Sequence, residues 1–200
     1  MSNPLSFDEV LFRQRLLSCS GLYDRKLDGI WGQHTDGAER EFFAQCDAIA
    51  NAIRVFDPRT ERNIRTLRLD AQPLARQSLA AIITPGVDAR IISGTRTYAQ
   101  QAALYRQGRN GNPGPRVTNA KAGNSWHNFG LAWDIGIFRN GDYLTDGADY
   151  DRAGPRGTIA GVEWGGNWRT FVDKPHFQTP FGASKITEAR LAFERGGRPA

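Results

Sequence analysis

The sequence predicts an α+β protein in which two helices come first and a small sheet with long loops follows. Apolar residues in the first 50 positions recur at helical spacing. Those between residues 89 and 138 instead form two short runs, one β-branched and one alternating, as in strands. Gly- and Pro-rich stretches separate these later segments. Helices followed by short strands with long loops are typical of α+β architecture.

Length and composition limit the class of protein. The chain has 200 residues, 40% hydrophobic and 24% charged, which predicts one domain with a small appendage. Its apolar runs are shorter than the roughly 18–20 residues that span a bilayer, so we expect no membrane insertion. The N-terminus lacks a basic segment followed by an apolar one, which predicts synthesis in the cytoplasm without a signal peptide. Two cysteines are too few for a disulfide scaffold.

The charge favours an anionic partner without identifying it. Lys and Arg number 26 against 21 Asp and Glu, for a net charge of +5. Such a surface suits nucleic acid, anionic lipid or bacterial wall polymers. Because the basic residues are scattered and no nucleic-acid motif is visible, we expect no nucleic-acid partner.

The first 52 residues predict a helical module. Ser6 and Glu9 fit a capping box at the start of one helix, and Gly21 is a plausible stop. Thr35 is the expected cap of a second helix. Two helices alone make a very small core, so residues 1–52 are expected to lean on a second domain, residues 53–200. The second helix would bury Ala38, Phe42, Cys46 and Ile49.

The boundary with the second domain is placed within a polar stretch at residues 51–72. A helix is expected from Pro73, a buried strand over 89–94 and another helix over 97–107. The Gly/Pro/Asn-rich loop 108–124 is expected to border a binding cleft. The remaining predictions are a strand at 131–138, a turn-rich stretch at 139–161, short strands within 162–166 and 174–178, and a final helix capped by Ser184.

The strand at 131–138 places a carboxylate on an open face. Its odd-numbered residues are apolar and should face the core, whereas Asp134 points the other way between Ala132 and Gly136. A carboxylate in an apolar strand is costly unless a cation pairs with it. A metal ion or an Arg would serve.

Two of the three histidines lie near carboxylates. His127 precedes Asp134 by seven residues, and His176 follows Asp173 by three. Two His and one Asp make a plausible catalytic zinc set with a fourth position left for water. Asp173 would then suit a general base, and Arg96 could hold an oxyanion. The alternatives stay open: a hydrogen-bonded His–Asp pair, a turn-capping Asp173 and a surface ion pair at Arg96.

Three blocks of the sequence, in this order, resemble a known family. Residues 93–109, 117–138 and 173–178 resemble the zinc peptidases that cut peptidoglycan stem peptides. These are the D-Ala-D-Ala carboxypeptidases and L-alanyl-D-glutamate endopeptidases of the hedgehog/DD-peptidase fold. The resemblance implies a small antiparallel sheet with flanking helices and a bound Zn²⁺. Residues 27–42 resemble a small peptidoglycan-binding module, although a helical hairpin that only buttresses the domain is the alternative.

The resemblance also implies roles for individual residues. His127, Asp134 and His176 would be the zinc ligands, Asp173 the catalytic base, and Arg96 the substrate and transition-state clamp. Ser125 matches a substrate-binding position. Residues 173–177 resemble the endopeptidase branch, since the carboxypeptidases typically have Glu before a Trp-His pair.

The expected function is therefore a cell-wall endopeptidase of the phage endolysin type that cleaves the L-alanyl-D-glutamate bond. We expect a monomer that acts on peptidoglycan after release from the host cytoplasm. The alternatives are a D-Ala-D-Ala carboxypeptidase of the same fold and a non-enzymatic, zinc-containing wall-binding protein.

Overall fold

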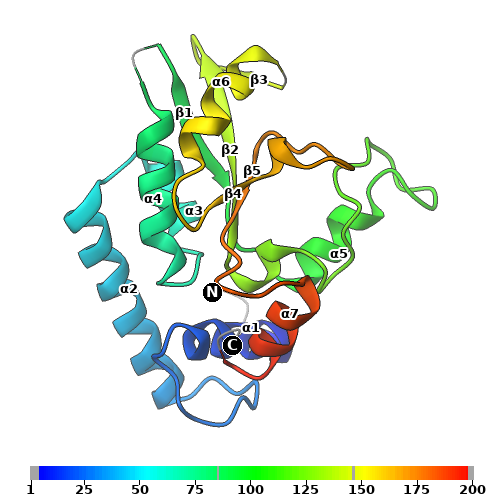
Figure 1. The fold of residues 1–200 in the computed structure, drawn as a ribbon. Coiled ribbons are helices and arrows are strands. Elements are labelled where there is room, and N and C mark those ends of the chain that lie inside the picture. The colour runs from blue at the N-terminus through cyan, green and yellow to red at the C-terminus, as the bar shows by residue number, and fades with distance from the viewer. Residues whose placement is uncertain (1–4, 85, 146, 198–200) are drawn as a thin grey trace.

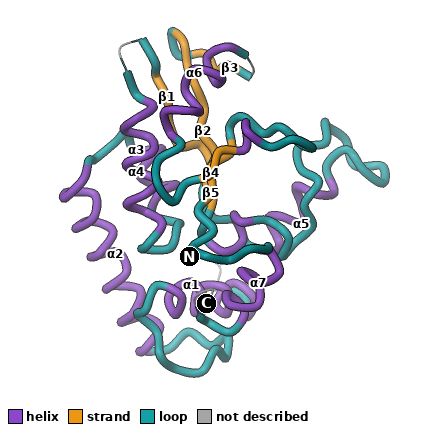
Figure 2. The backbone as a smooth tube through the Cα atoms, in the orientation of Figure 1, coloured by secondary structure: helices purple, strands orange, loops and turns teal. Residues whose placement is uncertain are grey.

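The structure, a computed structural model, describes residues 5–84, 86–145 and 147–197 and confirms the α+β class. Helices surround one antiparallel sheet (Figures 1 and 2). Within these residues, no helix is long and apolar enough to cross a membrane. The elements are α1 (Phe7–Cys19), α2 (Gln33–Ile53), α3 (Pro58–Ile64), α4 (Ala71–Ile82), β1 (Asp88–Ser93), α5 (Tyr98–Arg106), the 3₁₀ turn η1 (Trp126–Phe129), β2 (Ala132–Arg139), β3 (Asp142–Leu144), α6 (Ala148–Gly157), β4 (Glu163–Trp164), the 3₁₀ turn η2 (Gly165–Asn167), β5 (His176–Gln178) and α7 (Ile186–Glu194).

Strand β2 lies at the centre of the sheet. The strand order is β1-β2-β5-β4, and β3 pairs with the far end of β2. Opposite β5, Trp133 pairs with Phe177 and Asp134 pairs with His176. Because successive side chains of a strand point to opposite faces, one register places an aromatic pair on one face and an Asp–His pair on the other.

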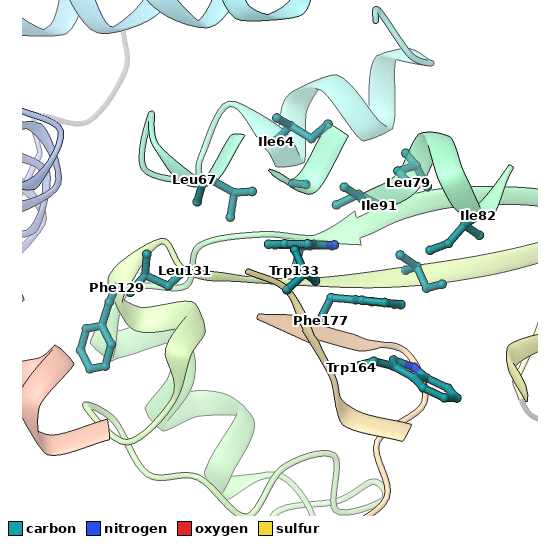
Figure 3. Close-up of a cluster of buried hydrophobic side chains, with 14 of the residues drawn as sticks. Ile64, Leu67, Leu79, Ile82, Ile91, Phe129, Leu131, Trp133, Trp164 and Phe177 are labelled. Carbon is teal, nitrogen blue, oxygen red and sulfur yellow. The ribbon is translucent and has the colours of Figure 1, made fainter. Parts of the chain in front are cut away.

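The aromatic face of β2 belongs to the main core, as its alternation predicts. Trp133 and Ile135 are fully buried with residues of α3 and α4 (Figure 3). The rings of Trp133 and Phe177 stack with centroids 6.3 Å apart. This packing holds β2 and β5 together and so positions the residues on their other face.

Both predicted N-terminal helices form, but the predicted cap of the second helix is wrong. Ser6 and Glu9 make the expected capping box. Thr35 does not cap the second helix, because α2 already begins at Gln33 with Gly32 as its N-cap. The Thr35 hydroxyl is instead buried and accepts a hydrogen bond from Gln14 Nε2 at 3.3 Å. The Thr35 side chain therefore makes a tertiary contact instead of capping the helix.

Helix α1 packs on two sides. Leu17 joins Phe42 and Cys46 of α2 in a small cluster. Phe12 and Leu16 join the main core, where Phe12 contacts Phe193 of α7 with ring centroids 5.2 Å apart. The helical pair thus leans on the rest of the molecule. A division of the chain between residues 52 and 53 remains a prediction, and it falls within the last turn of α2.

Two stretches that the sequence marks only as polar or turn-rich contain regular structure. Helix α3 lies inside the polar stretch 51–72, where Asp57 caps it and Glu61 pairs with Arg76 of α4. The stretch 139–161 contains β3 and α6. Gly154 lies inside helix α6, where only glycine leaves room for the Trp164 ring. A Cβ at this position would lie 2.0 Å from the ring.

The last helix begins one residue later than expected. Lys185, rather than Ser184, is the N-cap of α7. Glu188 reaches back and accepts a hydrogen bond from the Ser184 backbone N–H at 2.8 Å. Gly196 follows the helix with a φ of 72°, as expected of a stop residue.

Candidate metal centre

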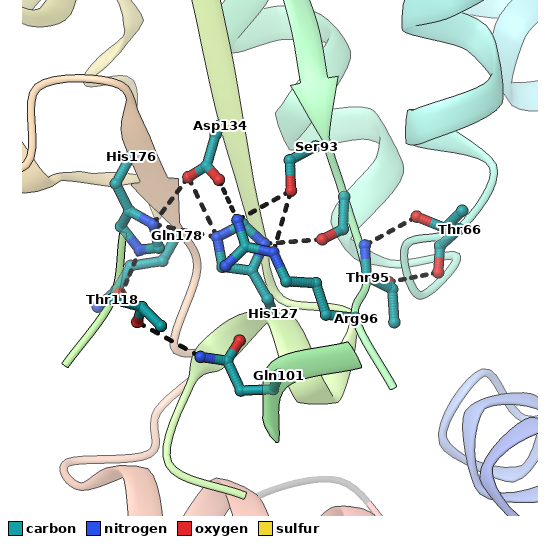
Figure 4. Close-up of polar contacts among 11 residues, drawn as sticks. Thr66, Ser93, Thr95, Arg96, Gln101, Thr118, His127, Asp134, His176 and Gln178 are labelled. Atoms are coloured by element: carbon teal, nitrogen blue, oxygen red, sulfur yellow. Dashed lines mark hydrogen bonds and ion pairs between the residues drawn. The ribbon is translucent and has the colours of Figure 1, made fainter. Parts of the chain in front are cut away.

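Three side chains from different elements converge on the open face of β2 (Figure 4). His127 comes from η1, Asp134 from β2 and His176 from β5. His127 Nε2 lies 3.1 Å from Asp134 Oδ1 and 3.2 Å from His176 Nδ1. The third edge, from His176 Nδ1 to Asp134 Oδ1, is 3.2 Å. The three potential metal ligands therefore form a nearly equilateral triangle.

The outer nitrogen of each imidazole faces an acceptor. His127 Nδ1 lies 2.7 Å from the Gly94 carbonyl oxygen, which can only accept a hydrogen bond. His176 Nε2 lies 3.0 Å from Gln178 Oε1. With protons on these outer nitrogens, a neutral His127 and His176 both point lone pairs at Asp134 Oδ1. Such an arrangement requires a cation in the middle.

The donor set fits a tetrahedrally bound metal ion. Zinc bonds to His nitrogen and carboxylate oxygen are about 2.0–2.1 Å long, which puts two tetrahedral ligands about 3.3 Å apart. The observed edges of 3.1–3.2 Å are close to this value. Three protein ligands also leave one position for water or substrate, as in catalytic sites.

Burial and charge shape the protonation of the three groups. Burial alone would raise the pKa of Asp134, but the imidazoles and Arg96 hold it well below its usual range. Burial lowers the pKa of His127. Burial would also lower the pKa of His176, but hydrogen bonding and the charge of Asp134 outweigh it and raise the pKa. The pKa values of the two imidazoles are thus shifted in opposite directions.

Arg96 is held next to this triangle. Its Nη2 donates to Asp134 Oδ2 and, at 2.9 Å, to Ser93 Oγ. Its backbone N–H donates to the His127 carbonyl at 3.0 Å, and its own carbonyl accepts from Asn128 Nδ2 at 2.8 Å. The guanidinium therefore faces the site, and the surface ion pair weighed as an alternative is not what forms.

Asp173 lies beside the triangle with its carboxylate available. The side chain lines the same pocket and makes no hydrogen bond or ion pair with any described residue. Burial raises the pKa of this carboxyl above its usual value. Its backbone approaches Gly165 so closely that a Cβ there would lie 2.5 Å from the Asp173 carbonyl oxygen. A partly buried, unpaired carboxylate of this kind suits proton transfer.

A pocket of about 490 Å³ contains these groups. Ser125 lines it, as does the second half of the loop 108–124 through residues 117–120 and 124. The expectation that this loop borders a cleft is confirmed for that half. The pocket rim carries exposed apolar side chains from three separate segments: Val117, Tyr143 and Phe171. His34 lies elsewhere, exposed in the first turn of α2.

Sequence reasoning missed two neighbours of His176. Gln178 accepts from its Nε2, and the Trp168 ring packs against it with centroids 5.1 Å apart. Gln178 had a readable signal, because residues two apart on a strand share a face. Trp168 had none, since it reaches the site from an irregular segment after η2.

Comparisons with known proteins identify similar peptidases. A family model described as D-alanyl-D-alanine carboxypeptidase matches residues 118–179. The peptidoglycan L-alanyl-D-glutamate endopeptidase CwlK of Bacillus subtilis (strain 168) is 33% identical over 123 residues, covering 54% of this chain and 73% of that protein. The L-alanyl-D-glutamate peptidase of Listeria phage A118 is 32% identical over 124 residues, covering 60% of this chain and 40% of that protein.

A solved structure is also similar. The L-Ala D-Glu endopeptidase ChiX of Serratia marcescens is 27% identical, covers 63% of this chain and 90% of its own, and has a TM-score of 0.46. The region matched by the family model, residues 118–179, contains His127, Asp134, Asp173 and His176. The likeness to CwlK extends over most of that enzyme. This chain therefore belongs to the family of peptidoglycan metallopeptidases that includes CwlK.

Proposed function

We propose that this protein is a zinc-dependent endopeptidase that hydrolyses the bond between L-alanine and D-glutamate in the peptidoglycan stem peptide. The observation that carries the proposal is the His–Asp–His triangle beside an unpaired, partly buried Asp173 in one pocket. The bond is suggested by the relatives, since CwlK and the Listeria phage protein are both named for L-alanyl-D-glutamate cleavage.

His127, Asp134 and His176 would hold the metal. When bound, zinc supplies a Lewis acid and lowers the pKa of a coordinated water to roughly 7. The outer contacts of both imidazoles, to Gly94 and Gln178, keep the ligand nitrogens facing inward. These contacts fix the tautomer and the orientation of both rings.

Asp173 would move the proton. Its carboxylate takes a proton from the attacking water as the water oxygen adds to the L-alanyl carbonyl carbon. It then returns that proton to the D-glutamate nitrogen as the C–N bond breaks, so proton and charge balance over the cycle. The raised pKa of Asp173 supports this role, because a carboxyl that is easier to protonate can serve in both steps.

Arg96 and Ser125 would position the substrate. The Nη2 of Arg96 is engaged by Asp134 and Ser93, which leaves Nη1 to donate to the developing oxyanion of the carbonyl. Ser125 lines the pocket beside Trp126, which supports a contact between its hydroxyl and the substrate. The net charge of +5 suits an anionic wall polymer.

Digestion of purified peptidoglycan tests the proposal. Metal-loaded protein is expected to release fragments with new D-glutamate amino termini, detected by mass spectrometry, and a chelator should abolish the release until Zn²⁺ is restored. Asp173→Asn should slow it by roughly 10²–10⁴-fold, because general acid–base catalysis is worth that much. Asp142→Asn, which changes an exposed carboxylate on β3, is the matched control.

The same digestion separates the alternatives. Free terminal D-alanine instead of new D-glutamate termini would assign the chain to D-Ala-D-Ala carboxypeptidases, the description of the matching family model. Binding to the wall with no new termini at all would assign it to the non-enzymatic proteins.

We also propose that the helical module, residues 1–52, attaches the monomeric enzyme to the wall and that the enzyme lyses bacteria as an endolysin after release from the host cytoplasm. In support, Ile30 and Trp31 are exposed in the loop before α2. Full-length Asp173→Asn protein should sediment with purified walls, and additional Ile30→Ser and Trp31→Ala changes should weaken this. Unchanged sedimentation would leave the module a buttress only.

A further inference from the structure

We propose that Gln178 is a positioning residue which, together with Glu163, holds His176 with Nε2 protonated and Nδ1 free to bind the metal. This inference rests on the proposed metal-dependent function. It concerns residues that neither contact the triangle's centre nor take part in proton transfer.

The orientation of the Gln178 amide follows from its two contacts. Gln178 Nε2 donates to Glu163 Oε2 at 2.8 Å. Because a carboxylate oxygen only accepts, the amide nitrogen must be the end that faces Glu163. Gln178 Oε1 then faces His176 Nε2 at 3.0 Å. The carboxylate thus fixes the amide, and the amide oxygen requires a proton on His176 Nε2.

The backbone makes this chain of contacts possible. Glu163 of β4 lies directly opposite Gln178 of β5 in the antiparallel register. His176 and Gln178 are two residues apart on β5 and share the face that carries Asp134. Gln178 is 5% exposed, so water competes little for its amide, whereas Glu163 is exposed and keeps its charge hydrated.

The same contact selects one orientation of the imidazole ring. If the ring turned over, carbon atoms would replace Nε2 opposite Gln178 and Nδ1 opposite Asp134, and both interactions would be lost. Trp168 packs against the ring but offers no comparable polar contact. Gln178 therefore favours the ring orientation in which Nδ1 points towards the metal position.

The two imidazoles differ in how they are held. His127 is oriented by the Gly94 backbone carbonyl, which no side-chain substitution removes. His176 is oriented by two side chains, Gln178 and Glu163. The His176 arm is thus the one whose orientation a side-chain substitution can loosen.

Metal affinity tests the proposal directly. The zinc dissociation constant is measured on the full chain by competition with a chromophoric chelator. Gln178→Leu should weaken binding by roughly 10–100-fold, the usual effect of losing such an outer contact. Glu163→Leu should have a smaller effect, since it frees the amide without removing it. Glu163→Gln, which still offers an oxygen to the amide, should stay within about threefold of wild type.

An exchange of the two residues provides the rescue. Gln178→Glu alone places two carboxylates together and should weaken binding. Combined with Glu163→Gln, it restores one donor and one acceptor in reversed order, so affinity should return towards wild type. In ¹⁵N-histidine spectra of the zinc-loaded protein, His176 should carry its proton on Nε2 in wild type and in the exchanged pair.

The outcomes are distinct. Equal zinc affinity in wild type and a folded Gln178→Leu variant, or no rescue by the exchange, would overturn the positioning role and leave the proposed function standing. Failure of the wild type to bind zinc would overturn both. Gln72→Leu, which removes a buried glutamine of α4 far from the site, controls for lost stability and should bind zinc normally. If Gln178→Leu does not fold, Glu163→Leu and the exchange decide.

Discussion

Two of the Arg–carboxylate pairs among the described residues, Arg76–Glu61 and Arg96–Asp134, do different things. Arg76 of α4 forms a two-pronged pair with Glu61 of α3, with both distances 2.7 Å. Arg76 also donates to the Arg54 carbonyl, and Glu61 also accepts from the Phe56 N–H. The carboxylate and both terminal guanidinium nitrogens of this pair are thus used within it or by the adjacent backbone, while the buried Arg76 Nε has no hydrogen-bond partner among the described residues.

The pair of Arg96 and Asp134 is arranged differently. Only Oδ2 of Asp134 is given to the arginine, and Oδ1 is directed at two imidazole nitrogens. The pair lines the pocket, whereas Arg76 is fully buried away from it. The comparison teaches that a buried ion pair points to function when its partners retain unused donors or acceptors in a cavity, and to structure when they do not.

The largest expected effect is the loss of catalysis when the pair of Arg96 and Asp134 is broken. Asp134→Asn should reduce peptidoglycan hydrolysis by roughly 10³-fold or more, since it removes a charged metal ligand and the partner of Arg96. Denaturant unfolding should show a smaller loss of stability for this variant than for Glu61→Gln, because Arg96 is partly open to solvent whereas Arg76 is fully buried. Substantial hydrolysis by this variant would contradict the comparison, and Asp142→Asn is again the exposed control.

The opposite result is expected at the structural pair. Glu61→Gln should lower the free energy of unfolding by about 3–5 kcal/mol, because it leaves the Arg76 charge buried without its counterion. Activity per folded molecule should not change. Urea unfolding monitored by circular dichroism measures the first quantity, and digestion at low temperature the second. A loss of activity without a loss of stability would show that the two pairs are not separate.

The structural pair also predicts a pH dependence. Burial alone would raise the pKa of Glu61, but the Arg76 hydrogen bonds outweigh it and lower the pKa in the folded state. The stabilisation is therefore fully present above the unfolded pKa of about 4.3 and is lost as the pH falls through the lower folded value. The stability difference between wild type and Glu61→Gln should be constant from neutral pH to about 5 and shrink below about 4.3. Shrinkage at higher pH would refute the assignment.

The smallest effect is expected where the core meets the site. Trp133 neighbours Asp134 but faces the core, and its Nε1 is buried with no hydrogen-bond partner among the described residues. Trp133→Phe therefore loses packing contacts but no hydrogen bond. It should lower the free energy of unfolding by only about 1–2 kcal/mol. Zinc affinity should be unchanged. A marked loss of affinity would show that the two faces of β2 are coupled.

The sequence determined the candidate site because its chemistry is concentrated in short segments. The alternation in β2 assigns Trp133 to the core and Asp134 to the open face without any tertiary information. Arg96, His127, Asp173 and His176 were identified from their local blocks, and the structure brings all of them to one pocket. Two missed features had local signals: Asn140-Gly141, both with positive φ, forms the tight turn between β2 and β3, and Gln178 follows His176 by two residues.

Only the tertiary structure decided how these groups are oriented. The lone pairs of His127 and His176 face inward because the outer nitrogen of each ring donates a hydrogen bond. The acceptors are the Gly94 carbonyl, directly after β1, and Gln178, two residues after His176 on β5. Thr35 leaves its expected capping role because Gln14 of α1 binds it. Helix α3, which Asp57 caps locally, is held against α4 by the pair of Glu61 and Arg76. Apart from Gln178, each partner is distant in sequence from the residue it contacts, and local spacing carries no information about such partners.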